Sequence, residues 1–168
     1  GWQHLPLDLD GLCGELAQYP ASNLGLRMGR QADGRCLVAL DIDDLVAFQV
    51  RADQLGALPA TFATRTGKGF HGVFQVDADV LARLTNFTKR DGIDARVQGG
   101  QIAVPPSLHP SGVHYQSMHT LAPARLTQPW VDWLLACSAP RVHVTPADCD
   151  CPADLVRDDR WRAEATAH

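Results

Sequence analysis

The sequence lacks any long apolar run, and this absence excludes a membrane-spanning protein. No stretch approaches the about 18 apolar residues that a transmembrane helix needs. The first residues also lack the basic segment and apolar core of a secretory signal, so we expect none. The chain begins with Gly1 rather than Met, and we therefore expect a fragment, a processed chain or a tagged chain. Repeats and low-complexity segments are missing too, which excludes collagen-like, coiled-coil and wholly disordered proteins.

Charge of one sign is not in large excess. The 168 residues carry 15 Lys and Arg against 19 Asp and Glu, a net charge of −4, which argues against a protein that coats nucleic acids generally. The basic residues gather in residues 64–96 and the acidic ones in residues 126–168. This distribution is compatible with an enzyme that handles phosphates at one site.

Cysteines are few, odd in number and scattered. Five of them without a secretory signal favour reduced thiols in a cytoplasmic compartment. Cys149 and Cys151 follow His143 and could belong to a zinc site. A single residue between the cysteines is short for a zinc knuckle, and a fourth ligand is not evident. The alternative is a solvated acidic tail, and the sequence leaves zinc binding open.

Apolar patterning predicts more strands than helices. Gly99 and Gly100 are typical of a hairpin turn between two of these strands. Strand-rich patterning followed by a polar segment predicts an α+β domain over residues 1–138 and an acidic, poorly ordered tail over residues 139–168. We expect strands at 22–28, 35–43, 61–66, 70–76, 93–97, 101–104 and 112–118, and helices at 79–90 and 129–137.

The clearest strand ends in two acids, Asp41 and Asp43. Residues two apart on a strand share a face, so both carboxylates project into one small volume. Such a pair repels unless a cation lies between the groups, and clustered hard oxygens suit Mg²⁺ or Mn²⁺. The alternative is a turn in which an acid caps the next element. Asp44 favours that alternative, because three acids in four residues are common in solvated loops.

Two further segments place charged groups beside a turn. The run from Thr66 to His71 contains two glycines, which let backbone N–H groups approach phosphate, while Lys68 and His71 supply positive charge. It does not have P-loop spacing, and the alternative is a hairpin turn with a surface lysine. Asp94 and Arg96 share a strand face, and their alternative is a surface ion pair of little energetic value.

A rigid loop follows at Pro105 and Pro106. It holds the hydroxyl of Ser107 and the imidazole of His109 in place, although a simple connecting loop would have the same composition. His114 and His119 continue a five-residue spacing that fits neither a helix nor a strand. We treat these two histidines as incidental.

Taken in order, these segments resemble a known family. They lie at 23–29, 41–43, 58–61, 66–74, 92–100 and 104–115. Together they are similar to the N-terminal prim-pol domain of bifunctional DNA primase/polymerases from plasmids, phages and integrated elements, within the archaeo-eukaryotic primase superfamily. The resemblance covers residues 20–136. It implies a prim-pol catalytic core with an RRM-like sheet and an additional small α/β unit.

The resemblance also implies roles for individual residues. Asp41, Asp43 and Asp94 correspond to the acids that bind catalytic Mg²⁺ or Mn²⁺, and His71 corresponds to the histidine that contacts the triphosphate of the incoming nucleotide. One departure concerns the turn, where Lys68 separates two glycines that are adjacent in the family. We expect further nucleotide or template contacts from Lys68, Arg96, Ser107 and His109.

The function implied is metal-dependent nucleotidyl transfer. The enzyme would add NTPs or dNTPs to a 3′-hydroxyl on a DNA template, with a primer, in the cytoplasm of a bacterial or archaeal host. The family also implies a downstream helical or helicase region in the full-length protein. Two alternatives stay open: a catalytically silent nucleotide- or DNA-binding module, and a metal-dependent phosphoesterase that uses the same acids with a water nucleophile.

Overall fold

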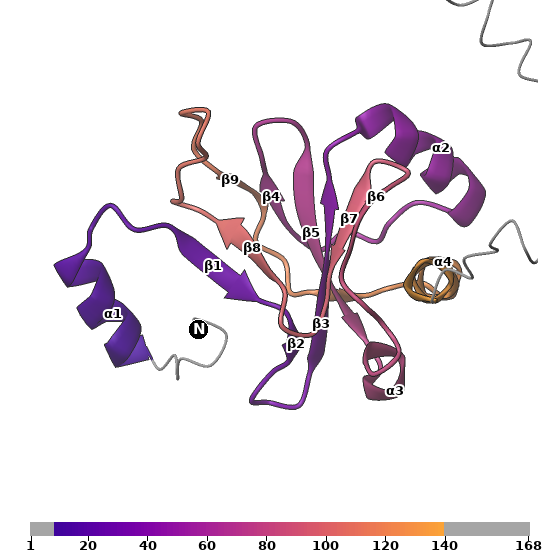
Figure 1. The fold of residues 1–168 in the computed structure, drawn as a ribbon, viewed down its shortest axis with the longest axis horizontal. Helices are drawn as coiled ribbons and strands as arrows, with labels where there is room; N and C mark the ends of the chain where they lie inside the picture. The colour runs from indigo at the N-terminus through magenta and orange to yellow at the C-terminus, as the bar shows by residue number, and fades with distance from the viewer. Residues whose placement is uncertain (1–8, 140–168) are drawn as a thin grey trace, which may run out of the picture.

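The fold is a mixed α/β structure built on a mostly antiparallel sheet (Figure 1). The structure, a computed structural model, describes residues 9–139; the predicted tail beyond Ala139 and the zinc candidates His143, Cys149 and Cys151 lie outside them. Six strands of the eight-stranded sheet run in the order β6-β7-β3-β5-β4-β9, with β2 beside β3 and β10 beside β5. The strands of this sheet are β2 Gly29–Arg30, β3 Cys36–Ile42, β4 Phe62–Arg65, β5 Phe70–Val76, β6 Phe87–Arg90, β7 Ile93–Arg96, β9 Gln116–His119 and β10 Ala124–Arg125.

Strand β3 divides its side chains between two cores. Val38, Leu40 and Ile42 are fully buried in the larger core, under the helices α2 (Leu45–Leu55), α3 (Ala78–Leu81) and α4 (Gln128–Ser138). Leu37 and Ala39 point to the opposite face and belong to the smaller core. Because successive side chains of a strand alternate between faces, Asp41 continues the second series. The continuous apolar run predicted for this strand therefore reflects burial on both faces.

Helices α2 and α4 are held together through aromatic side chains. The Trp130 indole, which is fully buried, stacks on Phe48 with 6.0 Å between centroids and donates its N–H to the carbonyl of Gly56 at 2.8 Å. Asp44 begins α2 as its N-cap, and a proline in the first turn begins α4. Among residues 9–139 no helix is long and apolar enough to cross a membrane.

The other face of the sheet is covered by a two-stranded ribbon. Strands β1 (Leu24–Arg27) and β8 (Gln101–Val104) pair antiparallel, with Leu24 opposite Val104. Ile102 of β8 and Met28, which follows β1, are buried in the smaller core. Helix α1 (Leu9–Gln18) precedes it along the chain and lies at the outer side of the ribbon (Figure 1). The sheet is therefore sandwiched between helices on one face and the ribbon on the other.

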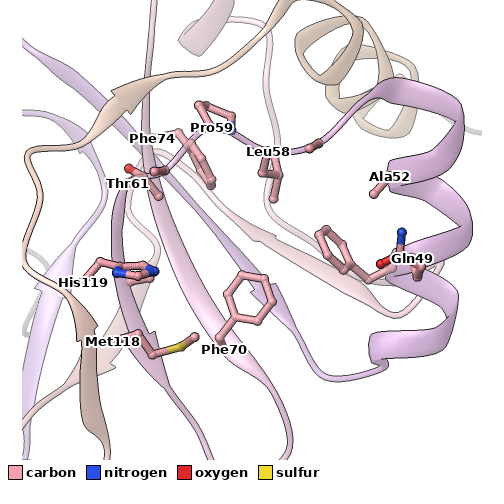
Figure 2. Close-up of a pocket in the computed structure, with 13 residues that line it drawn as sticks. Gln49, Ala52, Leu58, Pro59, Thr61, Phe70, Phe74, Met118 and His119 are labelled. Carbon is pink, nitrogen blue, oxygen red and sulfur yellow. The ribbon is translucent and has the colours of Figure 1, made fainter.

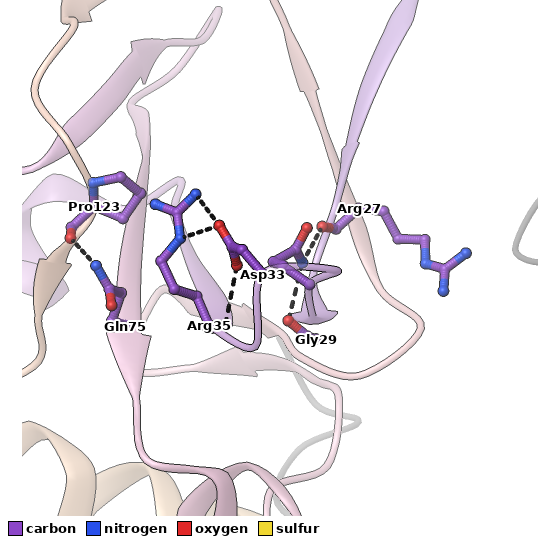
Figure 3. Close-up of polar contacts among 7 residues, drawn as sticks. Arg27, Gly29, Asp33, Arg35, Gln75 and Pro123 are labelled. Carbon is purple, nitrogen blue, oxygen red and sulfur yellow. Dashed lines mark hydrogen bonds and ion pairs between the residues drawn. The ribbon is translucent and has the colours of Figure 1, made fainter. Parts of the chain in front are cut away.

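Polar contacts close the turns at one end of β3 (Figure 3). Arg35 donates to both carboxylate oxygens of Asp33, at 3.0 Å from its backbone N–H and 2.7 Å from Nε. These bonds lower the pKa of the Asp33 carboxyl below its usual value. The Gln31 side chain donates to the carbonyl of Gly29 at 2.9 Å, and Gln75 donates to Pro123 at 2.7 Å. This end lies before β3, whereas the acids of β3 lie at its other end.

The structure corrects the predicted helix at residues 79–90. Its first part is helical in α3, but residues 87–90 form strand β6, paired with β7. Helix α3 ends at Leu81, and the Asn86 side chain ties the following segment to the end of β7, because Oδ1 accepts from Val97 N–H at 2.8 Å and Nδ2 donates to the Gln98 carbonyl at 3.2 Å. Leu81 and Leu84 fill the core as expected, whereas Phe87 enters it from a strand. Sheet pairing has overridden the local helical periodicity here.

Three other expectations change. Gly99 and Gly100 do not join a hairpin, because β8 pairs with β1 and not with β7. The strand predicted at 112–118 begins only at Gln116. Helices α1 and α2 were not expected from the sequence. Strands β2 and β10 were not expected either. The other predicted strands and the terminal helix lie within about a residue or two of their predicted bounds, which is the usual uncertainty of helix and strand ends.

Candidate active site

A row of polar side chains crosses four neighbouring strands on the face that carries the ribbon. Asp41 of β3 lies directly opposite Asp94 of β7 on one side and His71 of β5 on the other. His71 in turn lies opposite Thr64 of β4. Directly opposite residues share a face, with Cβ atoms about 4.5–5.5 Å apart. Strand pairing therefore brings together three of the four residues that the sequence singles out most strongly.

The ribbon fixes the imidazole of His71. The residue is 5% exposed, and its Nδ1 lies 3.2 Å from the carbonyl oxygen of Ala103 in β8. A carbonyl only accepts, so Nδ1 carries the proton in this contact. Nε2 then faces Asp41, 3.0 Å from Oδ1. The ring is held between the covering ribbon and the acid of the central strand.

Two buried side-chain oxygens near His71 have no hydrogen-bond partner. One is Asp41 Oδ1, whose contact with Nε2 is close in distance but is not directed as a hydrogen bond. The other is the hydroxyl of Thr64, a fully buried residue. Unpartnered buried polar atoms are rare in folded proteins and call for an explanation such as a ligand, an ion or water.

The three acids after β3 have different surroundings. Asp44 accepts from the N–H groups of Val46 and Ala47 at 3.0 Å each, so it caps α2 as the alternative interpretation predicted. Asp43 is exposed, and no donor among residues 9–139 contacts its carboxylate. Asp41 is half-buried, with 19% of its side chain exposed. The capping role thus falls to Asp44 and leaves Asp41 and Asp43 available for a ligand.

Asp41 and Asp43 line a small cleft of about 120 Å³. The cleft also contains the turn between β4 and β5, which places Lys68 opposite the two acids. Asp94, Arg96 and Ser107 are not among its lining residues. The cleft is lined by Asp41, Asp43, Thr66, Gly67, Lys68, His71, His109 and Tyr115.

The glycine-rich segment is a hairpin turn held by one hydroxyl. Thr66 Oγ1 accepts from the N–H groups of Lys68 and Gly69, at 3.2 and 2.9 Å. Gly69 packs directly on the carbonyl of Ile42, where a Cβ would lie 1.8 Å from the oxygen. The turn is therefore seated on the end of β3, next to Asp43. The hairpin interpretation is confirmed, and the same hairpin carries Lys68 into the cleft.

Asp94 is held by two protein donors. Its Oδ1 accepts from the backbone N–H of Lys89 at 2.7 Å, and its Oδ2 accepts from Arg96 at 2.8 Å. The ion pair expected as the alternative for Asp94 and Arg96 is therefore present. Arg96 therefore pairs its positive charge with Asp94 and does not line the cleft.

Ser107 and His109 have separate surroundings, although two residues apart. Ser107 is buried, and its hydroxyl both accepts from Leu24 N–H at 2.8 Å and donates to the Leu24 carbonyl at 3.1 Å. Its contacts join the loop to β1. His109 lines the cleft, and its Nδ1 accepts from the backbone N–H of Ser111 at 3.1 Å. The proton of a neutral His109 therefore sits on Nε2.

A comparison with protein families identifies this arrangement. The family model Prim-Pol, described as bifunctional DNA primase/polymerase, N-terminal, matches residues 1–130. The chain belongs to the Prim-Pol family. The predicted resemblance is confirmed, and family membership identifies a DNA primase/polymerase domain, which acts on nucleotides and DNA. No curated protein and no solved structure matches the chain.

Tyr115 of this Prim-Pol domain was not predicted as a site residue. Its ring lies between two imidazoles of the cleft, with centroids 5.7 Å from His71 and 6.0 Å from His109. Burial, followed by the negative charges of Asp41 and Asp43, raises the pKa of its phenol above 10.0. The sequence did contain one indication of this role, because Tyr115 lies in the segment 104–115 that resembles the family.

The donor set of the cleft suits a divalent cation. Prim-Pol enzymes are generally dependent on divalent metals. Among residues 9–139 no group of three or more His, Cys, Asp or Glu side chains is close enough to hold a metal ion. The pair Asp41 and Asp43 still offers hard oxygens without protein donors. The Oδ1 of Asp41 is buried and has no hydrogen-bond partner, and a bound cation would satisfy it. The residues present therefore fit the metal.

Proposed function

We propose that this Prim-Pol domain is a metal-dependent nucleotidyltransferase that adds NTPs or dNTPs to a 3′-hydroxyl on a DNA template. The observation that carries the proposal is the register of the sheet, which places Asp41 directly between His71 and Asp94. The family match supports the polymerase and primase class of the reaction. We assign the domain to a replication protein of a plasmid, phage or integrated element.

In the proposed mechanism Asp41 and Asp43 would hold Mg²⁺ or Mn²⁺, and Asp94 would complete the site. A bound divalent cation would supply Lewis-acid activation and would neutralise negative charge that develops during the transfer. Each oxygen of Asp94 already accepts one hydrogen bond, from Lys89 N–H or from Arg96, and keeps a second lone pair that a cation could use. Arg96 therefore acts beside the site, where it keeps Asp94 compatible with its neighbour Asp41.

The basic side chains of the cleft would bind the triphosphate. Lys68 is exposed on the hairpin turn and faces the cleft that Asp43 lines. The Nε2 of His71 faces Asp41, and it would donate to a phosphate only in the imidazolium form, because Nδ1 carries the proton of the neutral ring. A neutral His109 presents its Nε2–H as a donor. Donors fixed in place before the reaction stabilise charge as it develops on the leaving group. We keep Arg96 and Ser107 outside the direct nucleotide contacts, because their hydrogen bonds go to Asp94 and Leu24.

Primer extension on a DNA template tests the proposal. We expect extension with Mg²⁺ or Mn²⁺, and loss of extension in Asp41→Asn, Asp43→Asn and Asp94→Asn. Asp44→Asn is the matched control, since asparagine is an equally good helix N-cap and Asp44 does not line the active-site cleft. Wild-type extension by any of the first three variants would remove that acid from the metal site. Cleavage of phosphoesters without primer extension would instead support the phosphoesterase alternative.

A catalytically silent nucleotide-binding module is the second candidate. One observation favours it: Asp94 is engaged by Lys89 and Arg96 and does not line the cleft. Such a module binds nucleotide and DNA but extends no primer under any metal condition. Nucleotide titration of the same protein preparation distinguishes the silent module, which binds nucleotide, from an unfolded sample, which does not.

The wider context remains part of the proposal. It includes the RRM-like core with an additional small α/β unit, a catalytic domain over residues 1–138, the cytoplasm of a bacterial or archaeal host, and a helical or helicase region downstream. The paired strands β7, β3, β5 and β4 support a sheet-borne catalytic site of this kind. A longer chain that contains the downstream region would test whether that region is needed to start primers.

A further inference from the structure

The opposite face of the sheet carries an apolar pocket that the proposed reaction does not use. A cavity of about 330 Å³ lies between α2 and strands β4 and β5 (Figure 2). Figure 2 shows Gln49 and Ala52 of α2 on one side and Met118 and His119 of β9 on the other, with Phe70 at one end. The cavity lies on the helix-covered face, because Phe70 and Phe74 of β5 pack with the larger core.

The pocket combines aromatic walls with two polar groups at its sides. Phe48 and Phe70 meet edge to face, with 5.6 Å between ring centroids. Gln49 donates one amide N–H to Asp53 at 2.7 Å, which leaves its carbonyl oxygen and its other N–H available. His119 is exposed, and its imidazole makes no hydrogen bond within the described part of the chain. A flat ring with a polar edge matches such a lining better than an aliphatic chain does.

A groove connects this pocket to the active-site cleft. A second cavity of about 480 Å³ shares Phe70 and Met118 with the pocket. The same cavity shares Thr66, Gly67 and Lys68 with the cleft of the proposed active site. The turn between β4 and β5 therefore has the cleft on one side and the groove on the other. A single extended ligand has a continuous route across this turn.

The groove carries positive charge without acidic partners. Arg65 and Lys68 line it, both are exposed, and neither forms an ion pair within residues 9–139. Four arginines elsewhere in the described chain are neutralised by acids, in the pairs Arg35–Asp33, Arg51–Asp91, Arg96–Asp94 and Arg125–Asp77. Cations without partners beside an apolar, aromatic pocket are what a single nucleic-acid strand requires, with phosphates on the cations and bases on the rings.

We propose that the single-stranded part of the template crosses the turn between β4 and β5 and places one unstacked base in the pocket between α2, β5 and β9. The strand's identity as template rests on the proposed function. The backbone phosphates contact Arg65 and Lys68 in the groove. The base packs against Phe70 and Met118, and its polar edge meets Gln49 or His119. The pocket thus holds the template by a contact that reads no particular sequence, because every base has a π-face.

Photo-crosslinking locates the strand directly. The full chain is mixed with single-stranded oligonucleotides that carry 5-iododeoxyuridine at successive positions, irradiated, digested and analysed by mass spectrometry. We expect crosslinks on Phe70, Met118 or His119 from one or two adjacent positions. Crosslinks confined to other surfaces, with the strand otherwise bound, would overturn the proposal. Irradiation in excess unlabelled single strand serves as the control for specific binding.

Binding measurements with variants give a second, independent test. Arg65→Gln should reduce the slope of log binding constant against log salt concentration by about 1, because one phosphate contact is lost. Arg83→Gln removes the same charge at an exposed site that follows the other end of β5, and it should leave the slope unchanged. Equal slopes for Arg65→Gln and the wild-type chain would remove Arg65 from the path.

Filling the pocket tests the base contact. Ala52→Leu places a larger side chain on the pocket wall. Met118→Ala removes a side chain that lines the pocket, and because Met118 is exposed, the hydrophobic core keeps its packing. Each should weaken binding of a single strand by about 5-fold or more, the lower end of the effect of losing one stacked base. Unchanged affinity in both variants, with melting temperatures equal to wild type, would contradict the proposal.

These results are separable from the proposed function. Crosslinks in the pocket without any primer extension would retain the strand-binding site and reject the polymerase proposal. Primer extension with crosslinks only outside the pocket would do the reverse. Binding of duplex DNA but not of a single strand would overturn the proposed path, whichever result extension gives.

Discussion

Gly69 packs on the backbone of Ile42 so closely that its position has no room for a side chain. A Cβ on residue 69 would lie 1.8 Å from the Ile42 carbonyl oxygen and 2.9 Å from the carbonyl carbon. The contact joins the turn that carries Lys68 to the strand end that carries Asp43. Two groups of opposite charge are therefore positioned relative to each other by a contact between two backbones.

We expect Gly69→Ala to move the turn and to impair primer extension. Since backbone rather than a flexible side chain opposes the new methyl group, the cost should be about 1–3 kcal/mol of unfolding free energy. For a chain of this size each kcal/mol corresponds to about 2–4 °C in melting temperature. Gly67→Ala is the matched control, because its Cβ would meet only ordinary contacts at 3.6 Å and beyond. Equal melting temperatures and activities for both variants would contradict this account.

Neighbouring acids should respond differently to removal. Asp44→Ala should cost about 1 kcal/mol of stability through loss of the N-cap of α2. It should retain most primer extension. Asp43→Ala should keep the melting temperature and lose extension, because no protein group depends on its carboxylate. Thermal unfolding and primer-extension assays on the two purified variants test both expectations. The reverse pattern would assign the metal role to Asp44.

His71→Asn should weaken nucleotide binding more than DNA binding. Its amide N–H can replace Nδ1 in the contact with Ala103, so the ribbon keeps its anchor. The variant lacks Nε2, which we assign to the triphosphate. Loss of a hydrogen bond to a charged group costs about 1.5–3 kcal/mol, or roughly 10-fold or more in nucleotide affinity. Calorimetric titration with nucleotide and with DNA separates the effects, and a selective loss of DNA affinity would move His71 to the DNA side.

Arg96→Gln should destabilise the domain in the absence of metal. Asp94 then faces Asp41 across the sheet without its guanidinium partner, and loss of this charged hydrogen bond costs about 1.5–3 kcal/mol. Mg²⁺ should raise the melting temperature of Arg96→Gln more than that of the wild type, because the cation replaces the missing charge. Arg96→Lys should restore part of the stability. A smaller Mg²⁺ effect in Arg96→Gln would show that Asp94 does not approach the metal.

Tyr115 should make stability depend on alkaline pH. Burial and the charges of Asp41 and Asp43 raise the pKa of its phenol above the value of 10.0 that it has when unperturbed. The unfolded chain therefore loses this proton first, so stability falls as pH rises through 10 toward the folded-state pKa. Tyr115→Phe should flatten the dependence over that range. Unfolding in denaturant from pH 8 upward measures it, and an unchanged profile in Tyr115→Phe would contradict the assignment.

The sequence predicted the central strands because their patterning and their burial agree. Strand β3 is a continuous apolar run that ends in acids, and it is buried on both faces as that pattern indicates. The pairing of Asp94 with Arg96 also followed from alternation along a strand. Helix α2 escaped prediction, because Leu45, Val46 and Val50 are exposed and give it no clear apolar stripe. The acidic run did predict an acid that caps the next element, and Asp44 has that role, but the sequence did not indicate that this element is a helix.

What the sequence could not supply are contacts between distant segments. The glycine pair at Gly99 and Gly100 is typical of a hairpin, but β8 finds its partner in β1, far away in the chain. Phe87 fits a helical stripe, yet it enters the core from a strand that pairs with β7. Tyr115 reaches the cleft only because its loop folds back over His71. Local periodicity carries no information on such pairings.

The double-sided burial of β3 makes the length of this strand a stronger constraint than its composition. Exchanging one apolar residue for another at Val38 or Leu40 changes a volume, which neighbouring side chains can partly accommodate. Adding or deleting one residue before Asp41 instead reverses every later side chain, so the carboxylate turns into the helix-covered core. We therefore expect β3 to tolerate exchange of one apolar residue for another but no insertion or deletion. A change of length in the turn from Gln31 to Arg35 would cost only the local contacts of that turn.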